Sequence, residues 1–213
     1  MQTIKTFGVI GTGIIGAGWA ARALARGLNV LAFDPGADAQ DRLRDNLAQV
    51  WPVLERTGLF PGASVDRLRF CDSLEEVALG AQFIQESAPE RIELKTTLHA
   101  QIDAAAPADV LIASSTSGLL PSEFQSHCAH PGRVMVGHPF NPVYLLPLVE
   151  VLGGEQTDAD NIERAVALYR DLGMYPLKVR SEVPGFLSDR LQEALWREIL
   201  HLVNDDVATP EEL

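Results

Sequence analysis

The stretch VIGTGIIGAG, close to the start of the chain, constrains the fold more than any other. It sets Gly11, Gly13 and Gly16 in a GxGxxG spacing, after an apolar run at residues 6–11 and before a helical pattern at 14–27. The first glycine permits a tight turn, the second lets the backbone approach a pyrophosphate, and the third lets the helix pack on the strand. The helix N-terminus then offers free N–H groups to phosphates. The predicted dinucleotide contacts are Gly11, Thr12, Gly13, Ile14, Ile15 and Gly16.

Asp34 supplies a second sign of a dinucleotide site, because it ends the next apolar run at residues 29–34. An acid at this position accepts hydrogen bonds from the ribose hydroxyls and repels a 2′-phosphate, which favours NAD over NADP. The alternative is a glycine-rich turn in an α/β protein that binds no cofactor. The strand, loop and helix stand in the required order with the acid in place, which favours NAD as the cofactor.

The rest of the chain to residue 182 alternates strand-like and helical patterns. Such alternation predicts a doubly wound, mostly parallel sheet with helices on both faces, the Rossmann-type α/β fold. A helix is expected across residues 39–57, broken near Pro52, and another across 159–172. Further strands are expected at LRFC, QFIQE, VLIASS, RVMVGH, PLVEV and YPLKV.

The pattern changes near Val183, so we expect one domain at 1–182 and part of another at 183–213. Apolar residues recur every four positions along one long helix, at Leu187, Leu191, Leu195, Ile199 and Val203. This amphipathic stripe predicts the start of an all-α second domain, or a partner chain that covers it. The final VATPEEL is typical of another helix start, with Thr209 as the N-cap.

Composition limits the classes of function. The net charge of −12 argues against nucleic acid, which requires a basic surface, and mildly favours a cationic substrate. The chain carries no apolar run of membrane-spanning length, and no basic leader precedes the first strand-like run. Cys71 and Cys128 form no CxxC or Cys/His cluster, so we expect reduced thiols in a cytoplasmic protein that binds no metal or membrane.

Polar side chains follow the strand-like runs VLIASS and RVMVGH. The first run leads into a hydroxyl cluster, and the second leads to His138 and Asn141, with Glu150 in the following run. Since ligands bind beyond the carboxyl ends of strands in open α/β sheets, these groups are expected beside the cofactor. The alternatives are hydroxyl caps of a turn and a histidine in a packed loop.

The glycine loop, ASSTSG, GHPFNPV, LVEV and the later PGF…DRL together resemble the L-3-hydroxyacyl-CoA dehydrogenase family, in an order that spans nearly the whole chain. The resemblance implies that His138 is a general base and that Glu150 holds its second ring nitrogen. It also implies that Ser117 hydrogen-bonds the reacting oxygen and that Asn141 orients this oxygen or His138. It also implies cofactor contacts from three further residues. These are Glu90, Lys95 and Ser115.

The resemblance implies a small substrate with a 3-hydroxyl group. A CoA ester needs cations for its phosphates, and no dense Lys/Arg cluster is present. The stretches QESAPERIELK and SSTSGLLPSEF are most similar to the branch that acts on L-carnitine. Its quaternary ammonium would be held by aromatic faces, for which Phe140 and Tyr144 are candidates. The family commonly has Asn where this chain has Asp189, so no catalytic role is assigned to Asp189.

Several readings stay open at this point. The substrate is L-carnitine, a 3-hydroxyacyl-CoA or a sugar acid of the L-gulonate type. A related enzyme class with a lysine base in its second domain is disfavoured, because residues 184–213 hold no lysine. A redox-silent NAD sensor or a crystallin-like protein would not need the His138 group of side chains. The family also implies a homodimer formed through the helical domain.

Overall fold

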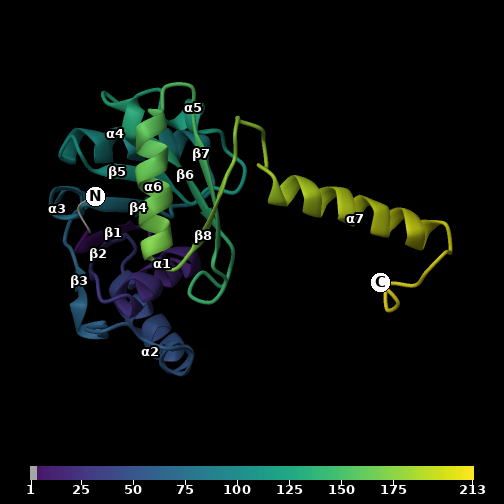
Figure 1. Cartoon of the computed structure of the whole chain (residues 1–213), viewed down its shortest axis with the longest axis horizontal. Coiled ribbons are helices and arrows are strands. Elements are labelled where there is room, and N and C mark those ends of the chain that lie inside the picture. Colours follow the sequence, from purple (N-terminus) through teal and green to yellow (C-terminus); the bar gives the residue numbers. More distant parts are fainter. Residues whose placement is uncertain (1–3) are drawn as a thin grey trace.

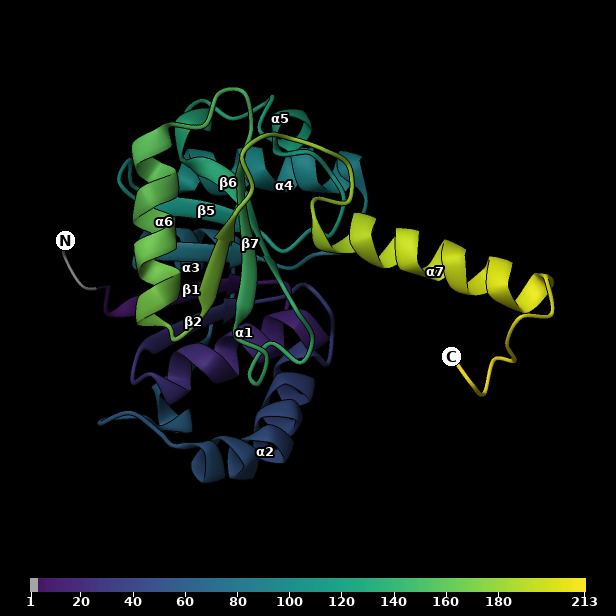
Figure 2. The same cartoon turned by 45° about the vertical axis from the view of Figure 1, so that its right-hand side comes forward.

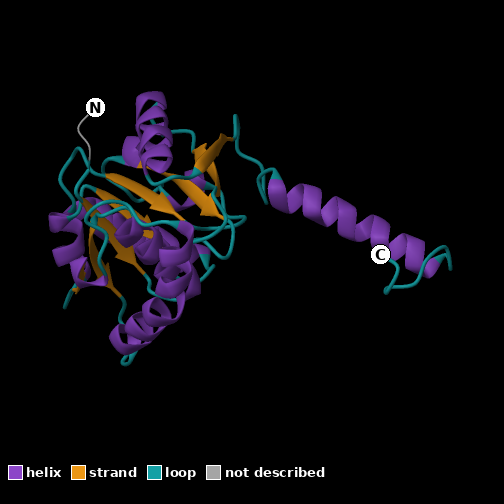
Figure 3. Cartoon of the chain, turned by 60° about the horizontal axis from the view of Figure 1, so that its bottom comes forward, coloured by secondary structure: helices purple, strands orange, loops and turns teal. Residues whose placement is uncertain are grey.

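The computed structural model describes residues 4–213, which form one mixed sheet with helices on both faces (Figures 1 and 3). The sheet has eight strands in the order β3-β2-β1-β4-β5-β6-β7-β8. The strands are β1 (Thr6–Ile10), β2 (Asn29–Phe33), β3 (Leu68–Phe70), β4 (Phe83–Glu86), β5 (Leu111–Ser114), β6 (Val134–Pro139), β7 (Leu148–Gly153) and β8 (Tyr175–Lys178).

Seven α-helices of the described chain accompany the strands. They are α1 (Ile14–Ala25), α2 (Ala39–Thr57), α3 (Leu74–Gly80), α4 (Ile92–Ala105), α5 (Pro121–Phe124), α6 (Ala159–Asp171) and α7 (Ser188–Asn204). One apolar core unites α1, α2 and α6 with the sheet, and a second unites α3, α4 and α5 with its other face. Two 3-10 turns, Val65–Arg67 and Pro131–Arg133, lead into β3 and β6.

The topology places a ligand crevice beside β1. The strands β2 and β3 extend from one side of β1, whereas β4 and the later strands extend from the other. Connections that leave β1 in opposite directions open a crevice at the carboxyl ends of the strands. All strand pairs are parallel except β6 and β7, so the predicted mostly parallel, doubly wound sheet is confirmed.

Two local expectations are wrong. The helix α2 continues through Pro52, which is exposed on its outer side, so the carbonyl left without an N–H partner can bind water. The segment after α7 forms a turn and no helix within the described residues, although the Thr209 N–H donates to the Glu212 side chain at 2.9 Å, a bond typical of a helix N-terminus.

The helix α7 projects away from the body of the molecule (Figures 1 and 2). None of its residues is buried, and Leu191 is 71% exposed. Among the described residues, no helix is long and apolar enough to cross a membrane. The predicted long amphipathic helix is confirmed, with an apolar stripe that nothing in this structure covers.

Candidate active site

The glycine loop joins β1 to α1, and its three glycines differ in the space available for a side chain. A Cβ on Gly11 (φ +86°) would lie 2.7 Å from the Ser87 carbonyl, and one on Gly16 would lie 1.9 Å from the Gly11 oxygen. A Cβ on Gly13 would meet nothing within 4 Å. Gly11 and Gly16 therefore serve the packing of the loop, whereas Gly13 faces open space in front of the α1 N-terminus, where a phosphate would bind.

Asp34 lies at the carboxyl end of β2, as the sequence predicts. Its Oδ2 accepts the Thr12 N–H at 2.8 Å, and its Oδ1 accepts the Gly36 N–H at 2.9 Å. The carboxylate also lines a cavity of about 850 Å³ that runs from Gly13 to Ser87. The volume is that of a typical small-molecule site, and an acid at its edge suits a ribose diol. These residues fit the adenosine half of NAD.

Ser115 lies just after β5 and joins three strands of the sheet. Its Oγ accepts the Trp19 indole N–H at 3.1 Å and the Gln85 amide at 2.8 Å, and it lies 2.9 Å from the Ser87 Oγ. Gln85 also donates to the Gly137 carbonyl at 3.0 Å. The hydroxyl predicted to contact the cofactor is thus already engaged with protein groups, which fix the ends of β4, β5 and β6 together.

Glu90 organises the loop that carries Ser117. Its Oε1 accepts the hydroxyl of Thr116 and the N–H groups of Ser117 and Gly118, at 3.0 and 3.3 Å for the two amides. Ser117 itself is exposed at the open end of the sheet. This loop geometry leaves the Ser117 hydroxyl available for a ligand, while Glu90 is occupied in holding the loop.

Lys95 lies beneath that loop and is only 1% exposed. Its Nζ contacts Glu86 Oε1 at 2.8 Å and Oε2 at 3.0 Å, and Ser114 Oγ donates to the same carboxylate at 2.5 Å. The ammonium has almost no exposed surface with which to touch a cofactor. His99 is also fully buried there, with a pKa lowered by burial, and its Nε2 lies 3.7 Å from Glu86 Oε2.

His138 and Glu150 face each other across the antiparallel pair of β6 and β7, where they are register partners. His138 Nδ1 lies 2.8 Å from Glu150 Oε2, and Glu150 is fully buried. A carboxylate at Nδ1 selects the tautomer that carries its proton there, which leaves Nε2 as a lone-pair base. The structure therefore brings together the pair that the sequence singles out.

The start of α7 also reaches Glu150. The Oε1 atom of Glu150 accepts the N–H groups of Leu187 and Ser188, both at 3.0 Å, and its Oε2 atom accepts the Ser188 hydroxyl at 2.6 Å. Burial acts to raise the pKa of Glu150, but the hydrogen bonds from His138 and Ser188 outweigh it and lower the pKa. The carboxylate is therefore held ionised at the base of the site.

Of three other predicted residues, Phe140 lies beside this pair, whereas Asn141 and Tyr144 line a different hollow. The Phe140 ring lies 5.4 Å from the His138 ring, while Asn141 is exposed and Tyr144 packs against the core below α1. Asn141 and Tyr144 line a hollow of about 280 Å³ with residues of α1 and α2. Asp189 lies on the first turn of α7, in a surface cleft formed by that helix and the residues before it.

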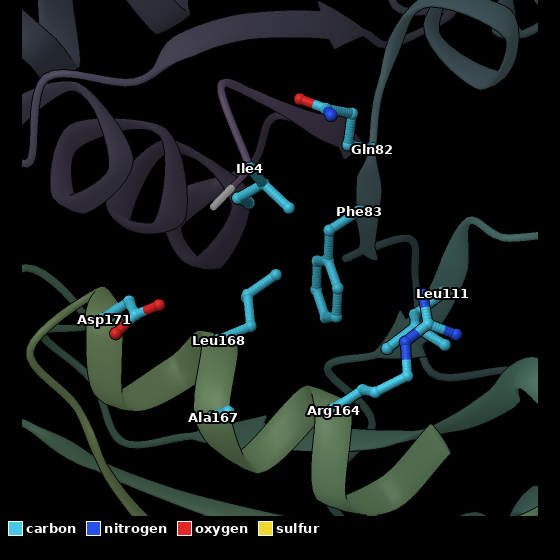
Figure 4. Close-up of a pocket in the computed structure, with 8 residues that line it drawn as sticks. All are labelled: Ile4, Gln82, Phe83, Leu111, Arg164, Ala167, Leu168 and Asp171. Carbon is cyan, nitrogen blue, oxygen red and sulfur yellow. The ribbon is translucent and has the colours of Figure 1, made fainter. Parts of the chain in front are cut away.

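A further hollow, of about 300 Å³, lies at the amino-terminal ends of β4 and β5, opposite the cofactor crevice (Figure 4). Phe83, the first residue of β4, points toward Leu168 of α6 there, and Leu111, the first residue of β5, also lines the hollow. The Arg164 guanidinium beside it donates to Asn161 and to the Asp109 carbonyl, both at 2.7 Å. Because ligands of such sheets bind at the carboxyl ends of the strands, we assign no function to this hollow.

Comparison with known proteins agrees with this geometry. A family model described as the 3-hydroxyacyl-CoA dehydrogenase NAD-binding domain matches residues 6–183. The chain belongs to this family, and NAD is the cofactor of its Rossmann-type domain. The predicted family and cofactor are thereby confirmed.

Individual relatives narrow the class. The chain is 62% identical over 210 residues to a Pseudomonas aeruginosa protein named L-carnitine dehydrogenase, covering 99% of this chain and 65% of that protein. It thus spans slightly less than two thirds of that relative's length. Among solved structures, 3-hydroxybutyryl-CoA dehydrogenase from Escherichia coli superposes with a TM-score of 0.90 at 30% identity, over 99% of this chain and 45% of that one.

A second solved structure has a different substrate. A 5-formyl-3-hydroxy-2-methylpyridine 4-carboxylic acid 5-dehydrogenase, described as an NAD⁺-dependent dismutase, superposes with a TM-score of 0.90 at 35% identity, over 98% of this chain and 68% of that one. The same fold therefore serves acyl-CoA and aromatic substrates, and the fold alone does not fix the substrate.

Sequence reasoning missed several residues that support the site. Gln85 and Glu86 lie at the end of β4. The stretch QFIQE predicts a strand, but it does not indicate which groups its polar side chains bind. Trp19 carries no sequence signal of its own beyond the helical pattern, and its indole N–H donates to the Ser115 hydroxyl. Ser188 lies within PGFLSDRL, and only the fold shows that its hydroxyl reaches Glu150.

Proposed function

We propose that this protein oxidises the 3-hydroxyl of L-carnitine to 3-dehydrocarnitine, with NAD as the hydride acceptor. The observation that carries the proposal is the 2.8 Å contact between His138 Nδ1 and Glu150 Oε2 at the end of a Rossmann sheet. The relative that is 62% identical is named L-carnitine dehydrogenase, which supports the choice of substrate.

In the proposed mechanism, His138 is the general base. Its Nε2 accepts the proton of the substrate's 3-hydroxyl, and the imidazolium that forms is stabilised by the buried Glu150 carboxylate. The exposed Ser117 hydroxyl hydrogen-bonds the reacting oxygen, and the Asn141 amide orients this oxygen or His138. Bound NAD supplies the acceptor for the hydride that leaves C3.

The cationic end of L-carnitine has no N–H to donate, so aromatic faces and carboxylates are its natural partners. Phe140 lies beside the His138 ring and is the first candidate; Tyr144 lines a separate hollow with residues of α1 and α2 and is the second. The net charge of −12 also favours a cation over a CoA ester.

The second candidate is a 3-hydroxyacyl-CoA, which the Escherichia coli relative named 3-hydroxybutyryl-CoA dehydrogenase favours at the lower identity of 30%. An L-gulonate-type sugar acid is the third. We also propose that residues 183–213 begin a helical domain that mediates a homodimer, and that the protein acts in the cytoplasm. The exposed apolar stripe of α7 and the two unpaired cysteines support these proposals.

The decisive experiment follows NADH formation with L-carnitine, D-carnitine, 3-hydroxybutyryl-CoA and L-gulonate as substrates. The proposal expects turnover of L-carnitine alone. His138→Gln should lower kcat by about 10²- to 10⁴-fold, the usual contribution of a general base, with NAD affinity unchanged. His127→Gln is the matched control, since His127 is exposed in the turn after α5, away from the site.

Turnover of the CoA ester or the sugar acid in place of L-carnitine would reassign the substrate and keep the chemistry. Near-normal turnover of L-carnitine by His138→Gln would remove the proposed base. NAD binding without turnover of any of the four substrates would favour a sensor.

A further inference from the structure

The Glu150 carboxylate has an unusually complete set of hydrogen-bond donors. It accepts from the His138 ring at 2.8 Å, from the Ser188 hydroxyl at 2.6 Å, and from the N–H groups of Leu187 and Ser188 at 3.0 Å. Three of the four donors belong to Leu187, the N-cap of α7, and to Ser188, its first residue. A carboxylate that is fully buried needs such donors to remain ionised.

The four donors are divided unequally between the two oxygens. The two backbone amides bind Oε1, whereas the Ser188 hydroxyl binds Oε2, the same oxygen that faces His138 Nδ1. The amides alone leave the carboxylate free to tilt about Oε1. The Ser188 hydroxyl is the contact that fixes the position of Oε2, and therefore the direction from which the carboxylate meets the imidazole.

The chain around Ser188 is itself held in place. Phe186 has a positive φ of 47°, is fully buried, and packs edge-on against the His138 ring at 5.7 Å. Upstream, Glu182 accepts the N–H and the hydroxyl of Ser122 at 2.7 and 2.6 Å. The segment between β8 and α7 is thus anchored at both ends, and only its later anchor touches the His138–Glu150 pair.

We infer that Ser188 is a positioning residue for the proposed dehydrogenase reaction, which fixes the Glu150 carboxylate against His138 Nδ1 and so keeps Nε2 as the base. The inference rests on the function proposed for His138. The orientation of His138 then depends on the start of α7, where the chain leaves the Rossmann domain. Ser188 touches neither the substrate nor the reacting atoms in this role; it acts through Glu150.

The experiment compares three variants. Ser188→Ala removes the hydroxyl, and Ser188→Thr retains it. Ser122→Ala is the matched control, because it removes a serine–glutamate hydrogen bond of the same 2.6 Å length from the same connecting segment without touching His138. It also removes the bond that the Ser122 hydroxyl accepts from the Glu155 N–H at 2.7 Å, so it is the more severe of the two changes to the segment. All three are studied in the complete protein, by steady-state oxidation of L-carnitine and by ¹⁵N NMR of the histidine rings.

In Ser188→Ala, kcat should fall by about tenfold, the scale of one lost hydrogen bond to a charged group, with KM and NAD affinity unchanged. The ¹⁵N signals of His138 should change from a single Nδ1–H tautomer to a mixture of both tautomers, with assignment from the His138→Gln spectrum. Ser188→Thr should restore both readouts, and Ser122→Ala should alter neither.

Two outcomes would overturn the inference. One is an unchanged His138 tautomer in a folded Ser188→Ala protein. The other is an equal loss of kcat in Ser122→Ala, which would assign the effect to loosening of the segment. The ¹⁵N signals of the His138 ring are measured without substrate, so they test the role of Ser188 independently of L-carnitine. If L-carnitine were not turned over, only the proposed function would be contradicted.

Discussion

The two ends of the cofactor crevice are built in different ways. At the adenosine end, backbone groups of the glycine loop and one carboxylate, Asp34, are supplied by residues 11–36 of the chain. At the reacting end, His138, Glu150 and Ser188 come from β6, β7 and the start of α7, and a buried Glu86–Lys95 pair lies below the neighbouring loop. The first end depends on local chain geometry, and the second depends on long-range contacts between side chains.

This difference predicts which property each end loses on substitution. A local backbone site loses its ligand when a single Cβ is added, because the ligand contacts the main chain directly. A network of buried side chains loses stability when one partner is removed, since the remaining charge or donor stays buried without its partner. Variants that separate ligand binding from stability therefore test the comparison directly.

The largest loss of stability is expected from breaking the buried Glu86–Lys95 pair at the reacting end. Lys95→Met should lower the free energy of unfolding by about 3–5 kcal/mol, because it leaves the fully buried Glu86 carboxylate without its cation. The double variant with Glu86→Gln should recover part of the loss. Urea unfolding measures both.

The control for that prediction is Lys178→Met, which breaks an ion pair with Glu163 that is exposed on both sides. Exposed pairs contribute little, so the urea midpoint should remain close to that of the unmodified protein. Equal losses from Lys95→Met and Lys178→Met would show that the buried pair is not what supports the reacting end.

The next effect separates two glycines of the adenosine end. Gly16→Ala should lose about 1–3 kcal/mol of stability as well as NAD affinity, because its Cβ would lie 1.9 Å from the Gly11 oxygen. Gly13→Ala should unfold at the same urea concentration as the unmodified protein, yet bind NAD at least about tenfold more weakly, since its Cβ projects into the space for the phosphates. Calorimetric titration with NAD, beside urea unfolding, checks both; tight NAD binding by Gly13→Ala would place the phosphates elsewhere.

A third prediction concerns the pH dependence of the reacting end. The pKa of Glu150 is lowered in the folded protein from its ordinary value of 4.5, with burial opposing and hydrogen bonds from His138 and Ser188 prevailing. A carboxyl group with a lowered folded-state pKa stabilises the fold above its unfolded pKa, and this stabilisation is lost as the pH falls through the folded-state pKa.

The stability difference between the unmodified protein and Glu150→Gln should therefore be largest at neutral pH and shrink as the pH falls below about 4.5. At neutral pH we expect about 1–3 kcal/mol, the scale of hydrogen bonds to a charged group. Urea unfolding at several pH values gives the curve. A difference that grows toward acid pH would contradict the assigned direction.

The contrast between the two ends also explains what the sequence predicts well. The glycine loop and Asp34 are visible because their signal lies in spacing along one βαβ unit, and the fold class follows from periodicity. His138 and Glu150 are also found, since each ends or occupies a strongly apolar strand run.

The supporting contacts are harder to predict because they join distant segments. Ser115 binds Trp19 across 96 positions of the chain, and Ser188 binds Glu150 across 38. Lys95 is predicted as a cofactor contact, yet the fold turns its side chain inward onto Glu86. Local patterns carry no information on such partners, which only the packing of sheet and helices determines.

The smallest effect is expected from Asp34→Asn at the adenosine end. The amide keeps the size of the side chain but replaces one acceptor by a donor, which cannot accept from both the Thr12 and Gly36 N–H groups as the carboxylate does, at 2.8 and 2.9 Å. NAD affinity should fall by about three- to tenfold, the scale of one weakened hydrogen bond, and the preference for NAD over NADP should narrow because the charge that repels a 2′-phosphate is gone. Titrations with both nucleotides measure the ratio, with Asp38→Asn, an exposed residue before α2, as the control. An unchanged ratio of NAD to NADP affinity would mean that Asp34 serves only to shape the loop, so that cofactor choice at this end would rest on the backbone alone.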